Sequence, residues 1–273
     1  MPKPMQLNHT CTLVTGASAG LGREILRLIV KEQGGQAIAV ARRRDRLDEL
    51  ARELQVVSAN SVEAFAADLS SREDVERCFV ETTRARRIDG IILNAGVTYY
   101  GKVAEQSIES IENIISTNAF GLTVLAAKFA KYFVDQKIPG RILLVSSMTG
   151  FSPMPYQAVY AGTKAYVTNF GLSLREELRG TGISVTVFCP GGIATEMLDK
   201  SGLSRRFKPD DFGMMDATTC AKHALAAFLS GRDLAVPGVG NWVGSVAQRL
   251  APRGLLARAV ERLYRGGINP SSS

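Results

Sequence analysis

Short apolar runs alternate with helical segments through the first 190 residues, and no other feature constrains the fold as strongly. Strands are expected over residues 11–14, 37–41, 62–67, 88–93, 141–146 and 183–189. Helices are expected over residues 21–32, 45–54, 72–85, 108–134 and 158–178. Such alternation is typical of strand–helix–strand units, whose right-handed crossovers cover both faces of a parallel sheet with helices. The sequence therefore predicts an α/β fold with a doubly wound parallel sheet in three α/β/α layers.

The chain of 273 residues departs from this alternation in two places. Residues 196–215 are polar and lack periodicity, which is typical of a mobile flap. Residues 241–267 predict two short helices broken at Pro252 and Gly254, with an apolar stripe on one side and arginines on another. We expect a single domain over residues 1–240 that includes the flap. A basic amphipathic extension follows over residues 241–273, and we expect its last residues, 268–273, to fray.

Composition excludes several protein classes. Hydrophobic residues make up 45% and charged residues 22% of the chain, which is typical of globular proteins and excludes general disorder. No run approaches the ~20 apolar residues that span a bilayer, and the N-terminus lacks the apolar core of a secretory signal. The four cysteines are scattered without a CxxC pair. We therefore expect no metal site, no disulfides and a location in the reducing cytoplasm.

Three glycines follow the first expected strand and open the first expected helix, in the run TGASAGLG over residues 15–22. Gly16 permits a tight turn, Gly20 lets the backbone approach a pyrophosphate, and Gly22 lets the helix pack closely on the sheet. Free N–H groups and the helix dipole then hold the anion. Ser18 and Leu21 belong to the same turn. Its position directly after a strand favours dinucleotide binding on a Rossmann fold over a plain turn without a ligand.

An arginine cluster follows the second expected strand. About 20 residues past the glycines, where an acidic residue would bind the ribose 2′-hydroxyl of NAD, the chain has Arg42 and Arg43. Guanidinium groups match a 2′-phosphate, so we expect NADP(H) as the cofactor. The alternative is a solvated helix N-terminus, which the helix dipole disfavours because it repels positive charge there.

Several further motifs follow the glycine turn in a specific order. They are Asp68-Leu69 after the third expected strand, the run NAG at residues 94–96, Asn118 in the long helix, Ser147 after the fifth strand, YAGTK at residues 160–164 and PGGIAT at residues 190–195. Over residues 11–234 the chain resembles the short-chain dehydrogenases/reductases, and with its basic tail it is similar to their DltE-like branch. The resemblance implies an oxidoreductase that interconverts a ketone and a secondary alcohol.

The resemblance also implies which residues bind the cofactor. The side chain of Asp68 would meet the adenine, with a simple helix cap as the alternative. The backbone of residues 94–96 would lie against the cofactor, and Thr195 would contact the nicotinamide carboxamide. The full set comprises Gly16, Ser18, Gly20, Leu21, Gly22, Arg42, Arg43, Asp68, Leu69, Asn94, Ala95, Gly96, Tyr160, Lys164, Pro190, Gly191, Ile193 and Thr195.

Tyr160 and Lys164 are one helical turn apart and therefore share a face of their helix. An ammonium ~4 Å from the phenol, at an effective dielectric constant of ~20, favours the phenolate by ~4 kcal/mol. This attraction predicts a tyrosine pKa lowered from ~10 to near ~7, so Tyr160 is the expected general acid and base. Ser147 would hydrogen-bond the substrate oxygen. By the resemblance, Lys164 holds the nicotinamide ribose and Asn118 binds a water that links Lys164 to solvent.

The candidate substrate contacts are Met154, Tyr156 and Met197, beside Ser147 and Tyr160. Further candidates for lining the substrate site are Phe151, Leu198 and Phe207. These side chains favour a lipophilic carbonyl compound or alcohol, although packing residues would look the same.

Three functions stay open. The first is NADPH-dependent reduction of a lipophilic ketone or 3-ketoacyl thioester, and the second is oxidation of a hydroxysteroid or another lipophilic alcohol. The third, a non-catalytic NADP-binding redox sensor, is disfavoured because a sensor needs no proton relay. The resemblance implies a homodimer or homotetramer. Nucleic-acid binding is not expected, because the net charge of +7 is modest. We expect the tail to cap the substrate cleft or pack on a partner subunit, with weak contact to anionic lipid as the alternative.

Overall fold

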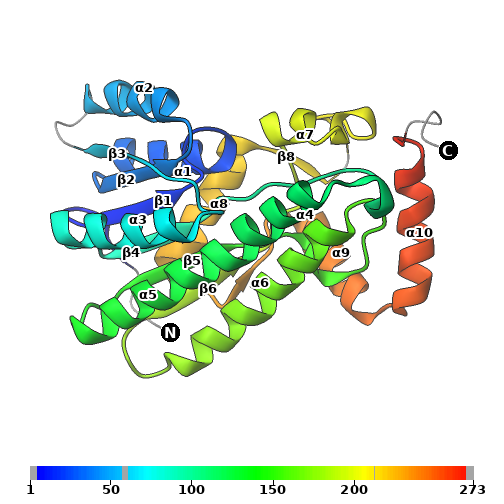
Figure 1. Cartoon of the computed structure of the whole chain (residues 1–273). Coiled ribbons are helices and arrows are strands. Elements are labelled where there is room, and N and C mark those ends of the chain that lie inside the picture. The colour runs from blue at the N-terminus through cyan, green and yellow to red at the C-terminus, as the bar shows by residue number, and fades with distance from the viewer. Residues whose placement is uncertain (1–4, 57–60, 212, 269–273) are drawn as a thin grey trace.

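In the described part of the chain, residues 5–56, 61–211 and 213–268 of a computed structural model, seven parallel strands form the central sheet (Figure 1). Their order is β3-β2-β1-β4-β5-β6-β9. The strands are β1 (Cys11–Thr15), β2 (Gln36–Ala41), β3 (Val62–Ala66), β4 (Gly90–Leu93), β5 (Arg141–Val145), β6 (Ser184–Phe188) and β9 (Leu234–Ala235). The chain proceeds from β1 to one edge and then restarts at β4 on the other side of β1. At such a switch point a crevice opens beyond the carboxyl ends of the strands.

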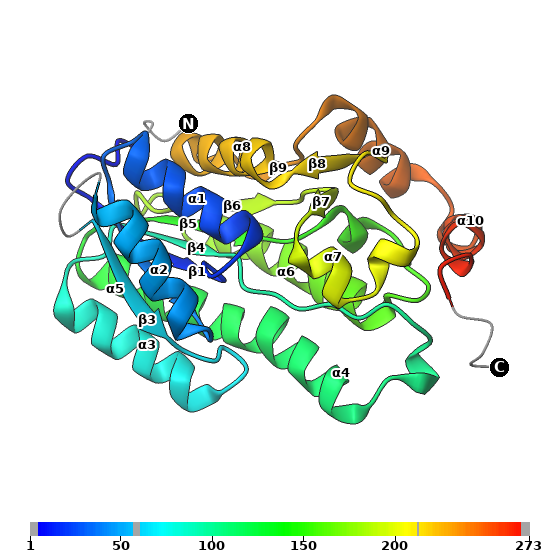
Figure 2. The same cartoon turned by 90° about the horizontal axis from the view of Figure 1, so that it is seen from above.

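Helices cover both faces of the sheet, as Figure 2 shows. One face carries α1 (Gly20–Lys31), α2 (Arg44–Gln55) and α8 (Ala217–Ser230). The opposite face carries α3 (Arg72–Ala85), α4 (Ile108–Ile115), α5 (Leu122–Asp135) and α6 (Ala158–Glu177). The predicted doubly wound sheet in three α/β/α layers is confirmed.

The central strands are apolar because both of their faces are buried. Every residue of β1, β5 and β6 is buried. Leu13 packs in the cluster under α3 and α5, whereas Val14 packs in the cluster under α1 and α8. Successive side chains of a strand point to opposite faces, so a strand between two helical layers needs an unbroken apolar run.

The single helix expected over residues 108–134 is interrupted. A π-helical turn, Ser116–Gly121, separates α4 from α5. Gly121 lies against the Leu69 carbonyl, where a β-carbon would come within 2.1 Å of the oxygen. Single π turns inside α-helices are frequent at functional sites, and this one carries Asn118.

The flap over residues 196–215 has more regular structure than its sequence predicts. It begins with α7 (Glu196–Lys200) and ends in β8 (Met214–Asp216), which pairs in parallel with β7 (Gly192–Ala194). Residue 212 lies outside the described residues. A helix of five residues and a strand of three are too short to show a hydrophobic period, so the sequence pattern could not reveal them.

The C-terminal extension forms the two predicted helices, α9 (Val239–Leu250) and α10 (Arg253–Arg265). Ala251 is extended because the residue before a proline avoids helical geometry, and Pro252 then precedes α10. Figures 1 and 2 show α10 at the outer edge of the molecule. Residues 269–273, part of the segment expected to fray, lie outside the described residues. Among the helices described, none combines the length and the apolar character needed to cross a bilayer.

Candidate active site

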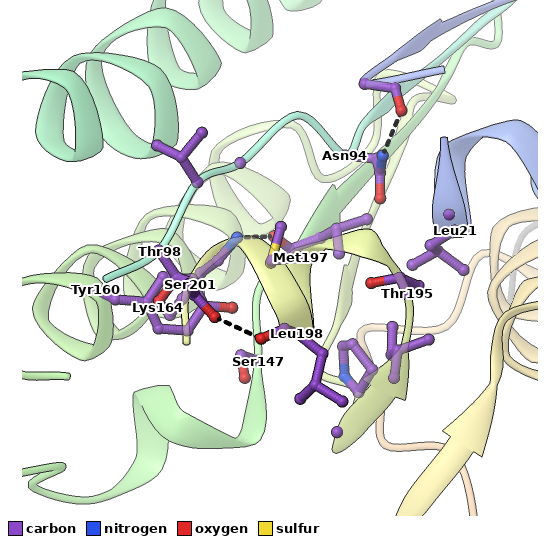
Figure 3. A pocket seen from close by; sticks show the side chains of 18 of the residues that line it. Leu21, Asn94, Thr98, Ser147, Tyr160, Lys164, Thr195, Met197, Leu198 and Ser201 are labelled. Atoms are coloured by element: carbon purple, nitrogen blue, oxygen red, sulfur yellow. Dashed lines mark hydrogen bonds between the residues drawn. The ribbon is translucent and has the colours of Figure 1, made fainter. Parts of the chain in front are cut away.

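A cavity of about 620 Å³ lies where the β1–α1 turn, the ends of β2 and β4–β6, the flap and the two C-terminal helices meet. Figure 3 shows its interior, with Tyr160 and Lys164 on one side and Leu21 and Thr195 on the other. The predicted site residues that line it are Gly16, Ser18, Gly20, Leu21, Arg42, Arg43, Asp68, Leu69, Asn94, Ala95, Gly96, Ser147, Met154, Tyr160, Lys164, Pro190, Gly191, Ile193, Thr195 and Met197. Its size falls within the range of small-molecule and cofactor sites.

Three predicted site residues, Gly22, Asn118 and Tyr156, are not among the described residues that line this cavity. Gly22 lies behind the turn, where a β-carbon would be 2.5 Å from the Gly16 carbonyl oxygen. Glycine at this position lets α1 lie close to the turn, and its part in cofactor binding stays a prediction. Gly16 has φ +70° and Gly20 has φ +54°, values that favour glycine.

The turn presents an open helix N-terminus to the cavity. Ala19, the N-cap residue of α1, makes no side-chain cap, so the first N–H groups of the helix receive no oxygen from that side chain. Thr195 faces Gly20 so closely that a β-carbon there would lie 3.0 Å from the threonine methyl group. Backbone donors and two glycines thus form a cradle that fits a pyrophosphate.

Basic groups gather beside this cradle around Glu196. The Arg43 guanidinium donates to the Ser18 hydroxyl at 3.1 Å and to the Glu196 carboxylate at 3.0 Å. Arg46 and Lys200 also donate to Glu196, the latter at 2.7 Å. These three cations, Lys200 foremost, lower the pKa of Glu196 to about 2. Glu196 was not predicted as a site residue, because nothing local in the sequence shows that residues 43 and 196 meet.

Arg42 and Asp68 stand at the edge of the cavity, with 3.9 Å between the guanidinium and the carboxylate. The Asp68 carboxylate accepts bonds from the N–H and the hydroxyl of Ser70, so it shapes the turn before α3. The N-cap of α3 itself is Ser71. Asp68 therefore combines a local structural role with a place in the cavity lining.

The run 94–96 is held in place by β1. The Thr15 hydroxyl accepts from the N–H groups of Asn94 and Ala95 at 2.9 and 3.0 Å. The Asn94 amide also donates to the Thr15 carbonyl at 3.0 Å. A β-carbon on Gly96 would lie 3.3 Å from the Asn118 amide oxygen and 3.5 Å from the Lys164 ammonium. Glycine here keeps the backbone close to both groups.

Tyr160 and Lys164 project from α6 into the cavity, as their spacing predicts. The Lys164 ammonium donates to the Val145 carbonyl at 2.8 Å and lies 5.6 Å from the centre of the Tyr160 ring. Ser147 follows β5, where its hydroxyl accepts from the Thr149 N–H at 3.2 Å and hydrogen-bonds Tyr160. The three groups therefore converge on one end of the cavity.

The predicted lowering of the tyrosine pKa is wrong for this structure. Burial raises the pKa of Tyr160 to about 12, and the hydrogen bond with Ser147 opposes that rise only in part. Burial also lowers the pKa of Lys164 to about 8. Attraction between the two charges lowers a tyrosine pKa, but burial desolvates both groups and disfavours both charged forms, and here the effect of burial is larger.

Asn118 is fully buried and clamps the chain after β4. Its amide oxygen accepts from the Val97 N–H at 2.8 Å, and its amide nitrogen donates to the Val97 carbonyl at 2.9 Å. The nitrogen also lies 3.1 Å from the Thr163 hydroxyl. Asn118 thus ties α6 and the π turn to the cavity wall, whereas the resemblance implied a water-binding role.

The wall beyond Ser147 includes side chains from the C-terminal helices. Asn241 and Gln248 of α9 and Tyr264 of α10 line it, beside the predicted Met154 and Met197. The further candidates Leu198 and Phe207 also line the cavity. Asn241 and Gln248 were missed because polar residues in a predicted surface helix read as solvent-facing.

Tyr156, predicted to contact substrate, turns away from the cavity. Its hydroxyl donates to the Glu261 carboxylate of α10 at 2.7 Å. Phe151 is covered by the Arg249 guanidinium, 5.1 Å from the ring centre. Both aromatic side chains therefore hold the C-terminal helices, and Tyr156 adopts φ +67° in doing so.

The chain is similar to known proteins in both sequence and fold. A family model described as short chain dehydrogenase matches residues 10–205. The NADP-dependent 3-hydroxy acid dehydrogenase YdfG of Escherichia coli is 35% identical over 202 residues, which cover 73% of this chain and 77% of that protein.

Two solved structures extend the comparison. The short-chain dehydrogenase from Sphingobium yanoikuyae in complex with NADPH is 30% identical with a TM-score of 0.78, covering 91% of this chain and 95% of that one. The bulky-bulky ketone specific alcohol dehydrogenase from Comamonas testosteroni is 26% identical with a TM-score of 0.75, covering 92% and 94%. Because the family model spans well over half of its length, this chain belongs to the short-chain dehydrogenase family of oxidoreductases.

Proposed function

We propose that this protein is an NADPH-dependent reductase of a lipophilic ketone or 3-ketoacyl thioester. The observation that carries the proposal is the convergence of Ser147, Tyr160 and Lys164 at one end of a cavity whose other end holds the glycine turn and Arg43. A proton donor and a dinucleotide cradle thus share a single cavity.

NADP(H) fits the donor set of the cavity. When bound, it supplies or accepts the hydride. Gly16, Gly20 and the open N-terminus of α1 would hold its pyrophosphate, and Arg42 and Arg43 its 2′-phosphate. The NADPH complex of the Sphingobium relative and the NADP dependence named for the Escherichia coli relative support this assignment.

The protein's own residues would supply the proton. Tyr160 carries its proton at neutral pH, because its pKa is raised to about 12, and would donate it to the substrate oxygen as negative charge develops there. The Ser147 hydroxyl would donate a hydrogen bond to the same oxygen. Below about pH 8 Lys164 is an ammonium, which would stabilise the phenolate left behind. Asn118 would position this set by holding the Val97 backbone.

Reduction uses Tyr160 as the acid and alcohol oxidation uses its phenolate as the base, so the reductive direction is itself part of the proposal. Met154, Met197, Leu198 and Phe207 give the substrate end an apolar wall, which supports a lipophilic substrate. The Comamonas relative is named for bulky ketones. A non-catalytic sensor remains the alternative of another class.

Two further properties belong to the proposal. The exposed Ile108, Ile115, Phe120 and Tyr166 lie on α4, the π turn and α6, and we expect a homodimer or homotetramer to cover them. A location in the cytoplasm is supported by the four cysteines, all of them free and buried.

The deciding experiment follows NADPH consumption, with NADH in parallel, across 3-ketoacyl thioesters, steroid ketones and aromatic ketones. Tyr160→Phe is the control, and its turnover should fall by about 10²–10⁴-fold while NADPH still binds. Turnover retained by that variant would exclude Tyr160 as the acid. NADPH binding without turnover on any substrate, in either direction, would favour the sensor.

The 2′-phosphate assignment has its own test. Replacing Arg42 and Arg43 with alanine should weaken NADPH binding by about tenfold or more and leave NADH binding nearly unchanged, because each charge-assisted hydrogen bond contributes about 1.5–3 kcal/mol. An unchanged ratio of the two affinities would overturn the assignment.

A further inference from the structure

The helix α9 has its amphipathic faces reversed relative to an ordinary surface helix. Asn241 and Gln248 line the cavity, and Ser245 is fully buried. The apolar side chains face outward instead: Val239 is 81% exposed, Trp242 56%, Val243 54% and Leu250 81%. Their spacing of three, four and eleven residues from Val239 places them on one face.

The helix α10 repeats this arrangement. Its inner side is held by Tyr264, whose ring packs against Phe207 at 4.9 Å, and by Glu261 through its bond with Tyr156. Its outer side exposes Leu255 (62%) and Leu263 (49%). Both helices lie at one end of the molecule (Figures 1 and 2), and each exposes apolar side chains there. Six large apolar side chains exposed on two consecutive helices are the kind of feature that marks an interaction surface.

Positive charge accompanies these apolar side chains. Residues 239–268 contain five arginines and one glutamate, a net charge of +4 within a chain of net charge +7. The glutamate, Glu261, is already paired with Arg265 at 2.7 Å. Arg258 and Arg262 are exposed on α10. Long arginine side chains can lay their stems on an apolar layer and keep their charge at its edge.

We propose that α9 and α10 form a docking surface for an anionic lipid bilayer, with both helices lying in the plane of the interface. Exposed tryptophan, leucine and valine beside arginine is the composition that favours this location. A second copy of the chain fits less well, because a twofold contact would bring the same +4 surface against itself. An anionic bilayer neutralises that charge and covers the apolar side chains at once.

Docking at this surface would also serve the proposed reaction, and this part of the inference rests on the proposed function. The inner sides of α9 and α10 supply Asn241, Gln248 and Tyr264 to the substrate end of the cavity. A lipophilic substrate dissolved in the bilayer would then reach the cavity beside the helices that bind the membrane. The substrate class that follows is a ketone or thioester partitioned into lipid.

Trp242 makes a direct test feasible because it is the single tryptophan of the chain. The full-length protein is mixed with vesicles of phosphatidylcholine containing phosphatidylglycerol, and with vesicles of phosphatidylcholine alone. With the anionic vesicles we expect co-sedimentation, a blue shift of the tryptophan emission and protection from iodide quenching. With the neutral vesicles, or at high salt, binding should fall by about tenfold or more, because screening weakens the arginine contribution.

Two double variants, each with a control, separate the contribution of the apolar side chains to vesicle binding from that of the arginines. The double change Val243→Glu and Leu250→Glu should lower vesicle binding by about tenfold or more, whereas Val80→Glu on the distant α3 should not. Arg258→Gln with Arg262→Gln should weaken binding to anionic vesicles, whereas Lys222→Gln with Arg232→Gln, also exposed, should not.

The outcomes are distinct. An emission shift that appears without lipid and depends on protein concentration would assign the surface to a second copy and overturn the proposal. Unchanged emission with every vesicle would overturn it too. Both results leave turnover of a water-soluble ketone untouched, so failure of the docking surface is distinguishable from failure of the proposed reductase activity. Vesicle binding without turnover would support docking and refute the reductase.

Discussion

Asn118 offers the most informative single perturbation, because its contacts give it a structural role in addition to the water relay that the resemblance implies. The side chain is fully buried and makes two bonds to the Val97 backbone and one to the Thr163 hydroxyl. We predict that Asn118→Ala destabilises the protein and lowers turnover at the same time, since the chain that follows β4 would lose its clamp.

The size of the effect follows from these contacts. A buried polar group left without its partner costs about 1–3 kcal/mol. Val97 is only half-buried, so water can replace part of what its backbone loses, and Thr163 keeps its bond to the Tyr160 carbonyl. We therefore expect a loss of about 2 kcal/mol. For a domain of this size such a loss lowers Tm by about 4–8 °C.

Calorimetry of the two proteins, with and without NADPH, measures this directly. Asn113→Ala is the matched control: the residue lies one turn earlier and its oxygen accepts a single bond, from Thr117 at 3.3 Å. The control should lower Tm by less than about 2 °C. If Asn118→Ala has the Tm of the wild type but no turnover, Asn118 does not clamp the Val97 backbone, and the water relay is its only role.

Three further predictions concern the cofactor end and the acid–base pair. Gly22→Ala should weaken NADPH binding at least about tenfold and destabilise the fold by about 1–3 kcal/mol, because the new β-carbon would overlap a backbone carbonyl. A β-carbon at Gly162 meets nothing within 4 Å, so Gly162→Ala is the control and should keep both its affinity for NADPH and its Tm. Titration with NADPH and thermal melts of the two variants measure these effects. Glu196→Gln should tighten NADPH binding up to about fivefold without affecting NADH, because the carboxylate competes with a 2′-phosphate for the same guanidinium; Asp199→Asn on the same helix should change neither affinity. Burial lowers the pKa of Lys164 to about 8, so the folded state releases this proton before the unfolded state does, and the contribution of Lys164 to stability rises between about pH 8 and about pH 10.5. Over that pH range Tm should therefore rise more, or fall less, in the wild type than in Lys164→Met. Equal changes in the two proteins would show that burial does not lower the pKa of Lys164.

Local patterns were sufficient wherever a feature depends on near neighbours in the chain. Six strands of the sheet differ from their predicted bounds by at most two residues at either end, because a strand buried on both faces must be an apolar run. The seventh, β9, was not predicted, since a strand of two residues is too short to show a pattern. Tyr160 and Lys164 share a face because four residues make about one turn of helix. The break between α9 and α10 at Pro252 is also local, because proline has a fixed φ and no backbone N–H to continue a helix.

Local patterns were insufficient where a long-range contact decides the outcome. Tyr156 looked like a substrate contact until the structure brought Glu261, 105 residues away, to its hydroxyl. Glu196 looked like an ordinary flap residue, yet Arg43 meets it across 153 residues. Such pairs carry no signal in the sequence of either segment, because each partner alone is an unremarkable polar side chain.

Periodicity along the chain was enough to predict the layers, and the motifs in their order carried the resemblance to the family. Tertiary packing set the protonation of the acid–base pair, since the pKa values of Tyr160 and Lys164 depend on how much water the surrounding elements exclude. It also decided that α9 turns its polar face inward and its apolar face outward, because a helical pattern defines two faces but packing alone chooses which one meets the protein.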